Sequence, residues 1–369
     1  MSDPATKFPE TISGILHIFV AFDWGDEVNL ELARKLAPAE SMELARRSRT
    51  PSSIAYRPAP LRFPLRVLRV ELPERGMVEA MADATLFDFA ATSIALHVPF
   101  SLPSERVVAM AAGLARPEAL VRTFRAALEP LFQQLKPAIR QPRWAEPSEE
   151  YFVFQLPPDG GLPSPQQLLK EAAPWIAGIV RLEAGPLSAE EISEALRQRI
   201  SYSPTDLLVA DWSATLLVDR DCDETLQTIE FANMQLLELR YIDSRINDRL
   251  KAAYQTLAPF SRSWLPLWRT HARPLRALGE LKVEANGLFE RSHNALKLVG
   301  DQYLARVYRL LTSRFHSDEW EQSIRESLTV SQEIYQVLAD QAATYRTELL
   351  EIVIIVLILF EIVMSLSGH

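Results

Sequence analysis

LLEIVIIVLILFEIVMSL, the run from Leu349 to Leu366, decides the architecture that the sequence predicts. As an α-helix, residues 349–366 would be about 27 Å long, close to the roughly 30 Å hydrocarbon core of a bilayer. Apolar side chains surround the whole helix, whereas a helix that lies on a membrane surface keeps one polar face. The run therefore predicts a C-terminal transmembrane helix over residues 349–366.

Two carboxylates interrupt the predicted anchor. Glu351 can lie at the headgroup level, but Glu361 lies about 15 Å further along the helix, where an ionised carboxylate costs roughly 2.5–3.5 kcal/mol. The surrounding Ile, Val, Leu and Phe residues contribute about −0.3 to −0.6 kcal/mol each and offset that cost. A buried helix in a soluble oligomer, with Glu361 paired to a basic group, is the alternative. The residues expected to form the anchor are Leu349, Ile352, Ile355, Leu359, Phe360, Glu361 and Val363.

The position of the apolar run predicts how the protein is placed. Three residues follow Leu366, so insertion would occur after translation and would leave the body on the cytoplasmic or matrix side, with membrane lipid as a partner. In that setting Glu361 would be protonated or would face a neighbouring copy, which predicts a homo-oligomer through the stalk and tail. Residues 1–10 lack the basic and apolar regions of a secretory signal.

Composition narrows the function classes. The chain has 369 residues, with 39 Lys and Arg against 48 Asp and Glu, and its net charge of −9 argues against DNA binding or general coating of nucleic acid. Its single cysteine cannot form an intrachain disulfide. Its 12 glycines are about 3% of the chain, against about 7% in average proteins, so glycine-rich phosphate loops are not expected.

The pattern of apolar residues predicts an α+β fold with duplicated lobes, followed by a long-helix stalk or bundle that ends in the transmembrane helix. The expected boundaries are 1–12 for a disordered start, 13–145 and 146–220 for the two lobes, 221–348 for the stalk and 349–366 for the anchor. Two similar pentapeptides, DFAAT at 88–92 and DWSAT at 211–215, support the duplication. Helical spacing predicts one helix over 222–257 and another from Asp318 into the tail. Residues 77–81 are expected to form a short helix, and 179–183 an extended segment.

One segment is strongly basic. Residues 251–314 contain eleven cations and four acidic residues, a net charge of +7 in an acidic protein. This segment predicts contact with anionic lipid, RNA or an acidic protein. Alternatively, its cations neutralise the acidic helices on either side within one bundle. The residues expected to form the anionic-partner surface are Arg262, Trp264, Trp268, Arg269, Arg273 and Arg276.

The sequence contains no catalytic motif. It has no G-x-S-x-G, Walker A or G-x-G-x-x-G pattern, and its six histidines include no pair at metal-ligand spacing. Glu290 and His293 form a single E-x-x-H, whereas a di-iron bundle needs two with further carboxylates. Cys222 lies among acidic residues that disfavour its thiolate. The polar residues between 230 and 249 are expected to form a solvated helix face or interhelical ion pairs. We therefore expect no cofactor, metal or catalytic residue.

The last fifty residues resemble a known family. WEQSIRESL from Trp320 to Leu328, then Tyr335, then LEIVIIVLILFEIV at 350–363 are similar to the C-terminal signature of the YagE-type proteins, also called the required-for-meiotic-nuclear-division family. LELR at 237–240 through NDRL at 247–250 is similar to the helical segment that precedes the tail in that family. The resemblance implies an α+β body in a membrane-anchored, non-enzymatic protein, and mitochondrial members of the family support organellar translation. It supplies no catalytic residues.

These observations predict a non-enzymatic, membrane-anchored scaffold or tether that binds a partner near the membrane as an oligomer. An RNA-, ribosome- or lipid-binding factor that acts through residues 251–314 is the first alternative. An enzyme housed in the α+β lobes is the second, and the few glycines and missing motifs argue against it.

Overall fold

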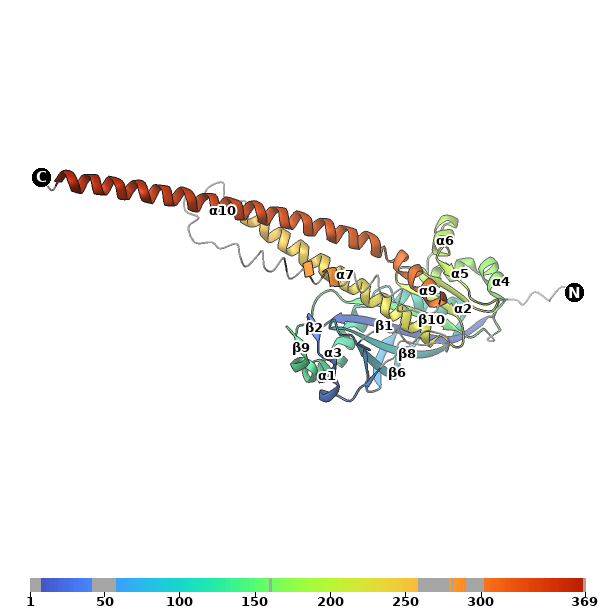
Figure 1. Ribbon diagram of the computed structural model, residues 1–369. Helices are drawn as coiled ribbons and strands as arrows, with labels where there is room; N and C mark the ends of the chain where they lie inside the picture. The colour runs from blue at the N-terminus through green and yellow to red at the C-terminus, as the bar shows by residue number, and fades with distance from the viewer. Residues whose placement is uncertain are drawn as a thin grey trace. The chain divides into compact units, whose positions relative to one another are not determined.

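The computed structural model describes residues 8–41, 58–158, 161–257 and 302–367, together with 279, 282, 283, 285–287 and 289 (Figure 1). These residues form a mixed α+β structure. The chain divides into two compact units, one of Met1–Tyr241 with Glu290–Asp318 and the other of Ile242–Phe289 with Glu319–His369.

A sheet of nine strands organises the first unit. Its central strand, β1, pairs antiparallel with β8 on one side and with β10 on the other. In sheet order the strands are β11 (Arg199–Ile200), β12 (Leu207–Ala210), β13 (Ala214–Val218), β10 (Glu149–Leu156), β1 (Thr11–Asp23), β8 (Ala91–Pro103), β7 (Ala82–Leu86), β4 (Leu61–Pro64) and β3 (Glu40–Ser41). Two short pairs lie outside this sheet, β2 (Glu27–Val28) with β9 (Ile139–Arg140) and β5 (Leu68–Leu72) with β6 (Gly76–Ala80).

One face of the sheet carries the main apolar core. Successive side chains of a strand point to opposite faces, and Leu16, Ile18 and Val20 of β1 point into this core, where they are fully buried. In the helix α3 the buried residues recur every four positions from Leu120 to Phe132, which is the spacing of one helical face. The helical elements that supply residues to this core are α1 (Leu30–Leu36), α2 (Ser104–Gly113), α3 (Glu118–Leu135), η1 (Lys136–Ala138), α4 (Pro165–Glu171), α5 (Ala173–Arg181) and α6 (Ala189–Ala195).

The helices α7 (Asp223–Leu257) and α9 (Gln302–Arg314) cover the opposite face. Every residue of α7 from 228 to 239 is buried, as in a helix that packs on all sides. The Phe231 ring of α7 lies 5.7 Å from the Phe87 ring beside β7, and the Tyr151 ring of β10 lies 5.4 Å from the Phe315 ring directly after α9. The first unit therefore has three layers, with the sheet between two layers of helices (Figure 1).

The predicted duplication of two lobes is wrong. Both segments contribute strands to the same sheet, but they do so with different topology. β8 runs antiparallel to β1, whereas β13 runs parallel to β10 after a crossover through α4, α5 and α6. The similar pentapeptides at 88–92 and 211–215 each include a turn and the first two residues of a strand, β8 and β13, so they mark similar strand starts within one sheet.

Two local expectations also need correction. Residues 77–81 form most of the strand β6 rather than a helix, because Val78 pairs with Val70 in a hairpin. The segment expected to be extended at 179–183 completes α5 and then turns at Leu182, whose φ of 54° is left-handed. The predicted long helix over 222–257 is confirmed by α7, and the last helix, α10, spans Ser317–Ser367, with its start beside the expected Asp318.

In the second unit, α10 packs against residues of the preceding segment. The Arg325 guanidinium lies 4.3 Å from the centroid of the Phe289 ring, and Lys282 Nζ donates a hydrogen bond of 3.1 Å to Gln332 Oε1. Ile324 and Leu328 are buried in this part of α10. These contacts anchor the first half of the helix.

The prediction of a transmembrane helix at 349–366 is wrong. Among the residues that the structure describes, no helix has the length and apolar character needed to cross a membrane. The carboxylates provide the physical reason: the uncharged run between Glu351 and Glu361 is residues 352–360, about 14 Å of helix against a hydrocarbon core of about 30 Å. The single-pass anchor with its body on the cytoplasmic or matrix side is withdrawn with it.

Candidate functional site

Two histidines face each other across the middle of the sheet. The register of β1 and β8 places His17 directly opposite His97, and their Nδ1 atoms lie 2.6 Å apart. His17 is 5% exposed. At this distance one of the two Nδ1 atoms must donate a proton and the other must accept it.

The partners of His17 fix which nitrogen carries its proton. His17 Nε2 lies 2.9 Å from Oε1 of Gln155 on β10, and the Gln155 amide donates to the carbonyls of Asp219 and Arg220 at 3.0 and 3.2 Å. Because Oε1 of Gln155 can only accept, His17 is protonated at Nε2 and its Nδ1 accepts from His97. Burial, together with the charge of His97, lowers the pKa of His17 to about 4 despite the hydrogen bond to Gln155. His17 is therefore neutral near pH 7.

Asp83 and Arg62 extend this arrangement to the next two strands. His97 Nε2 lies 3.6 Å from Asp83 Oδ1, and Arg62 Nε donates to Asp83 Oδ2 at 2.6 Å. Burial alone would raise the pKa of Asp83, but hydrogen bonds from His97 and Arg62 outweigh it and lower that pKa. We call Gln155, His17, His97, Asp83 and Arg62 the polar row. It crosses the five adjacent strands β10, β1, β8, β7 and β4.

Glu230 of α7 lies close to the polar row. Its side chain is buried, and burial raises the pKa of Glu230 to about 7. The neighbouring Asp83 adds to the shift, while a hydrogen bond from Ser93 and the charges of Arg62 and His97 oppose it. The row and Glu230 therefore form a polar layer on the face of the sheet that α7 covers. This layer is buried at His17 and Glu230 and about one-third exposed at His97 and Arg62.

Replacing His17 with asparagine is expected to reduce the loss of stability in acid. The unfolded chain binds a proton at His17 as the pH falls below 6.5, whereas the folded protein does so only near pH 4. This difference costs the native protein about 3 kcal/mol between pH 6.5 and pH 4, and the asparagine variant lacks it. Urea unfolding at a series of pH values measures the difference, and parallel curves for the two proteins would contradict it.

Polar residues of α7 are buried, which corrects the expectation of a solvated face between residues 230 and 249. Glu230, Asn233 and Glu238 are each 3% exposed or less. The Asn233 side chain donates to the Glu149 carbonyl at 3.2 Å, and Arg240 forms an ion pair with the Glu149 carboxylate. These polar residues of α7 are buried because they contact polar groups of the sheet, such as the Glu149 carbonyl and carboxylate.

A second buried carboxylate joins α5, α9 and the β12–β13 turn. Asp211 is 1% exposed and lies between two arginines. Arg181 Nε of α5 is 2.8 Å from Asp211 Oδ2, while Arg314 of α9 donates to Asp211 Oδ1 through Nη2 at 2.5 Å and Nε at 2.8 Å. Arg314 also donates to Glu194 at 3.1 Å. We call Asp211, Arg181 and Arg314 the arginine clamp.

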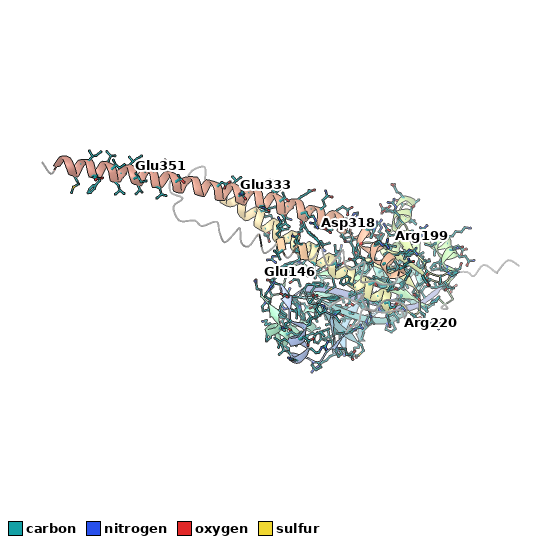
Figure 2. The ribbon with its side chains drawn as sticks, viewed as in Figure 1. Glu146, Arg199, Arg220, Asp318, Glu333 and Glu351 are labelled. Atoms are coloured by element: carbon teal, nitrogen blue, oxygen red, sulfur yellow. The ribbon has the colours of Figure 1, made fainter. Side chains whose placement is uncertain are left out.

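A groove lies beside the Gln155 end of the polar row. It has a volume of about 600 Å³ and opens to solvent where β1, β8 and β10 end. Among the described residues that line it, the charged ones are Arg75, from the β5–β6 turn, and Arg220, labelled in Figure 2. The other residues that line it are Ser13, Gly14, Ile15, Pro99, Phe100, Ser101, Gln155 and Pro157. A Cβ on Gly14 would overlap the Gln155 carbonyl, so only glycine fits there.

The residues predicted to form an anionic-partner surface are not brought into this site. Arg262, Trp264, Trp268, Arg269, Arg273 and Arg276 lie outside the described residues. Of the other cations counted in 251–314, Arg314 is 13% exposed and belongs to the arginine clamp. Arg314 therefore pairs with a carboxylate of its own chain instead of contributing to an exposed basic surface.

The residues predicted to form the anchor belong to α10. Ile352, Ile355, Leu359, Phe360, Glu361 and Val363 are all exposed there. Leu349 also falls within the bounds of this helix. Side chains project on all sides of the C-terminal end of α10, beyond the labelled Glu351 (Figure 2).

Metal and thiol chemistry have little support at the described positions. No group of three or more His, Cys, Asp or Glu side chains in the described ranges could hold a metal ion. Burial raises the pKa of the Cys222 thiol to about 12, and the charges of Asp219, Asp223 and Asp221 add to the shift. The nearby carboxylates therefore act as expected, although burial has the larger effect. Glu290 and His293 lie outside the described residues.

Local spacing in the sequence does not reveal the histidine pair. His17 and His97 are 80 residues apart. Each, however, interrupts a β-rich apolar run, in GILHIFVAF at 14–22 and IALHVPF at 94–100. A polar residue at the middle of two such runs is a signal that the runs pair and that their polar residues meet.

Residues 13–224, which contain most of the sheet, match a known protein family. A model of the family described as "Uncharacterized protein MJ0711, N-terminal domain" matches residues 13–224. The chain belongs to this family. It is 28% identical over 207 residues to the uncharacterized protein MJ0711 of Methanocaldococcus jannaschii, across 55% of this chain and 62% of that protein. The match to the MJ0711 family includes the polar row, the groove and Asp211.

The resemblance to the YagE-type family is thereby corrected. The matching family is that of the MJ0711 N-terminal domain, and its match ends at residue 224. The resemblance rested on segments after residue 236, where regular helical spacing and an apolar tail are patterns that unrelated helices share. The family-model match over residues 13–224 decides the assignment.

Proposed function

We propose that this protein is a non-enzymatic scaffold that assembles with further copies of itself through residues 350–364 of α10, the apolar segment. One observation carries the proposal. Thirteen large apolar side chains between Leu350 and Met364 are each 44–63% exposed. Glu351 and Glu361 are the charged residues within the segment.

The size of this surface favours a partner. Contiguous apolar patches on monomers rarely exceed a few hundred Å², and larger ones mark interaction sites. Burying a single Leu, Ile, Val, Phe or Met side chain contributes about 1.5–3 kcal/mol. Because the thirteen side chains are already about half covered, burying the rest of their surface contributes roughly 10–20 kcal/mol, which is comparable with or larger than the usual cost of association, about 4–15 kcal/mol.

A second copy of the chain is the occupant that fits this chemistry. The segment offers aliphatic and aromatic surface around the whole helix and few polar groups that a different protein could recognise by hydrogen bonding. Identical apolar helices pack side by side with interlocking side chains. The absence of Walker A, G-x-S-x-G and related motifs in the sequence supports the non-enzymatic part of the proposal.

Disulfide cross-linking between copies tests the proposal. Cys222 is replaced with serine, and single cysteines are placed in turn at each residue from 352 to 360. We expect disulfide-linked dimers at positions that recur every three or four residues, which is the pattern of packed helices. Met77→Cys, 60% exposed on β6, is the control for random collision. Cross-linking no higher than this control at all nine positions would contradict the proposal.

Glu361→Gln is expected to increase cross-linking through the apolar segment. The carboxylate interrupts the apolar surface, and packing copies side by side brings like charges together and removes them from water. Glutamine keeps the shape without the charge. The matched control is Glu333→Gln, an exposed residue of the same helix outside the segment, labelled in Figure 2. Equal cross-linking yields of the single-cysteine variants with and without Glu361→Gln would show that Glu361 lies outside the contact.

A further inference from the structure

We propose that the groove at the ends of β1, β8 and β10 binds a small organic anion that has an apolar body and a phosphate or carboxylate head. The groove lies wholly within the first unit, and this inference does not depend on self-assembly through α10. It rests on the charge of the lining, on how the two arginines are held, and on the apolar surface between them.

The lining has the opposite sign to the protein. The chain carries a net charge of −9, yet among the described residues that line the groove the charged ones are two arginines, Arg75 and Arg220. Guanidinium groups bind phosphate and carboxylate through paired, charge-assisted hydrogen bonds. These guanidinium groups would therefore attract an anion to the groove, although the protein as a whole is acidic.

The turn that carries Arg75 is fixed before any ligand binds. Arg106 of α2 donates to the Glu74 carboxylate at 2.7 Å and to the Glu74 carbonyl at 3.0 Å. Glu74, the acidic residue directly before Arg75, is therefore already paired with Arg106. Gly76, with a φ of 65°, completes the turn in a conformation that favours glycine. The backbone that carries Arg75 is thus fixed at the edge of the groove, which lowers the entropic cost of binding there.

The loop that carries Arg220 is held by the polar row. The Gln155 amide donates to the carbonyls of Asp219 and Arg220, and His17 orients Gln155 from the other side. The Asp219 carboxylate accepts a hydrogen bond from the Asp221 backbone at 3.2 Å, within its own loop. The polar row therefore positions the backbone from which Arg220 extends.

The rest of the lining is largely apolar and fits the apolar part of a ligand. Ile15, Pro99, Phe100 and Pro157 give the lining apolar surface, and the Ser13 and Ser101 hydroxyls are 2.9 Å apart and bonded to each other. A volume of about 600 Å³ is typical of sites for small molecules, which bury an apolar body and fix one polar end. Inorganic phosphate alone would leave most of the groove empty.

Calorimetric titration of the full chain with four probes tests this assignment. The probes are octyl phosphate, octanoate, octan-1-ol and inorganic phosphate. We expect octyl phosphate or octanoate to bind at least tenfold more tightly than octanol and inorganic phosphate, and the tighter of the two anions identifies the head group. Arg75→Gln and Arg220→Gln should each weaken that binding roughly ten- to a hundredfold, the usual effect of losing a charge-assisted hydrogen bond.

Arg69→Gln is the matched control. Arg69 lies on β5 of the same hairpin, is exposed and pairs with Glu79 at 2.6 Å, and it does not line the groove. Binding that is equally strong in the parent, Arg75→Gln and Arg220→Gln would place the ligand elsewhere, for example on the apolar segment of α10. Octanol binding as tightly as the anions, or no binding of either anion, would also overturn the proposal.

Discussion

Replacing Asp211 with alanine is expected to destabilise the first unit by about 3–5 kcal/mol, the usual cost of removing one partner from a buried ion pair. The Asp211 carboxylate is 1% exposed and balances two arginines. Without it, Arg181 and Arg314, whose side chains are 27% and 13% exposed, keep their charges in a poorly solvated place. Urea unfolding of the two proteins measures the difference.

Loss of the arginine clamp is also expected to loosen α9 locally. Arg314 ends α9, so α9 should exchange its amide hydrogens faster in the Asp211→Ala variant than α3, which has no contact with the clamp. Glu79→Ala, which breaks the exposed pair with Arg69, is the control and should cost about 1 kcal/mol or less. An Asp211→Ala variant that unfolds at the same urea concentration as the parent would contradict the role of the clamp.

Glu230→Gln is expected to stabilise the protein by about 3 kcal/mol at pH 8 and to have little effect below pH 4.5. Burial raises the pKa of Glu230 to about 7 in the folded protein, from 4.5 in the unfolded chain. As the pH rises through this window, the unfolded chain gives up a proton that the folded protein retains. Glu230 therefore lowers stability increasingly from pH 4.5 to pH 7, and glutamine removes this effect. Unfolding curves at pH 4.5, 6 and 8 measure the trend.

Glu171→Gln provides the matched control for this prediction. Glu171 is exposed at the end of α4, and its substitution changes the net charge by the same amount. The stability of this control should follow the parent at every pH. A Glu230→Gln variant that tracks the parent across the same range would show that the carboxyl group of Glu230 titrates as it does in the unfolded chain.

Features that depend on local periodicity could be read from the sequence. The helix over 222–257 and the last helix from Asp318 both appear at or near the expected positions. Their signals lie within a single element, since apolar residues recur at the period of a helix or a strand. Predictions of this kind need no knowledge of the partner against which each element packs.

Features that depend on pairing could not be read in this way. The contact between His17 and His97 exists because β1 and β8 align residue for residue over their whole length. Likewise, Arg314 was counted in a basic segment, but it pairs with Asp211, 103 residues away. The buried Glu230 shows the same limit, because a polar residue on a long helix is exposed or buried according to what covers it.

The mass of the intact protein in native mass spectrometry tests the central claim, that copies assemble through the apolar segment. We expect the full chain to be observed at a multiple of its 41.7 kDa, and a variant with Ile354→Lys and Ile358→Lys to be observed at 41.7 kDa. Lysine retains helix propensity, so these changes remove apolar surface without breaking α10. The matched control, Val330→Lys with Val337→Lys, alters exposed residues of the same helix and should keep the multiple. A full chain observed at 41.7 kDa, or a segment variant with the same mass as the parent assembly, would contradict the claim.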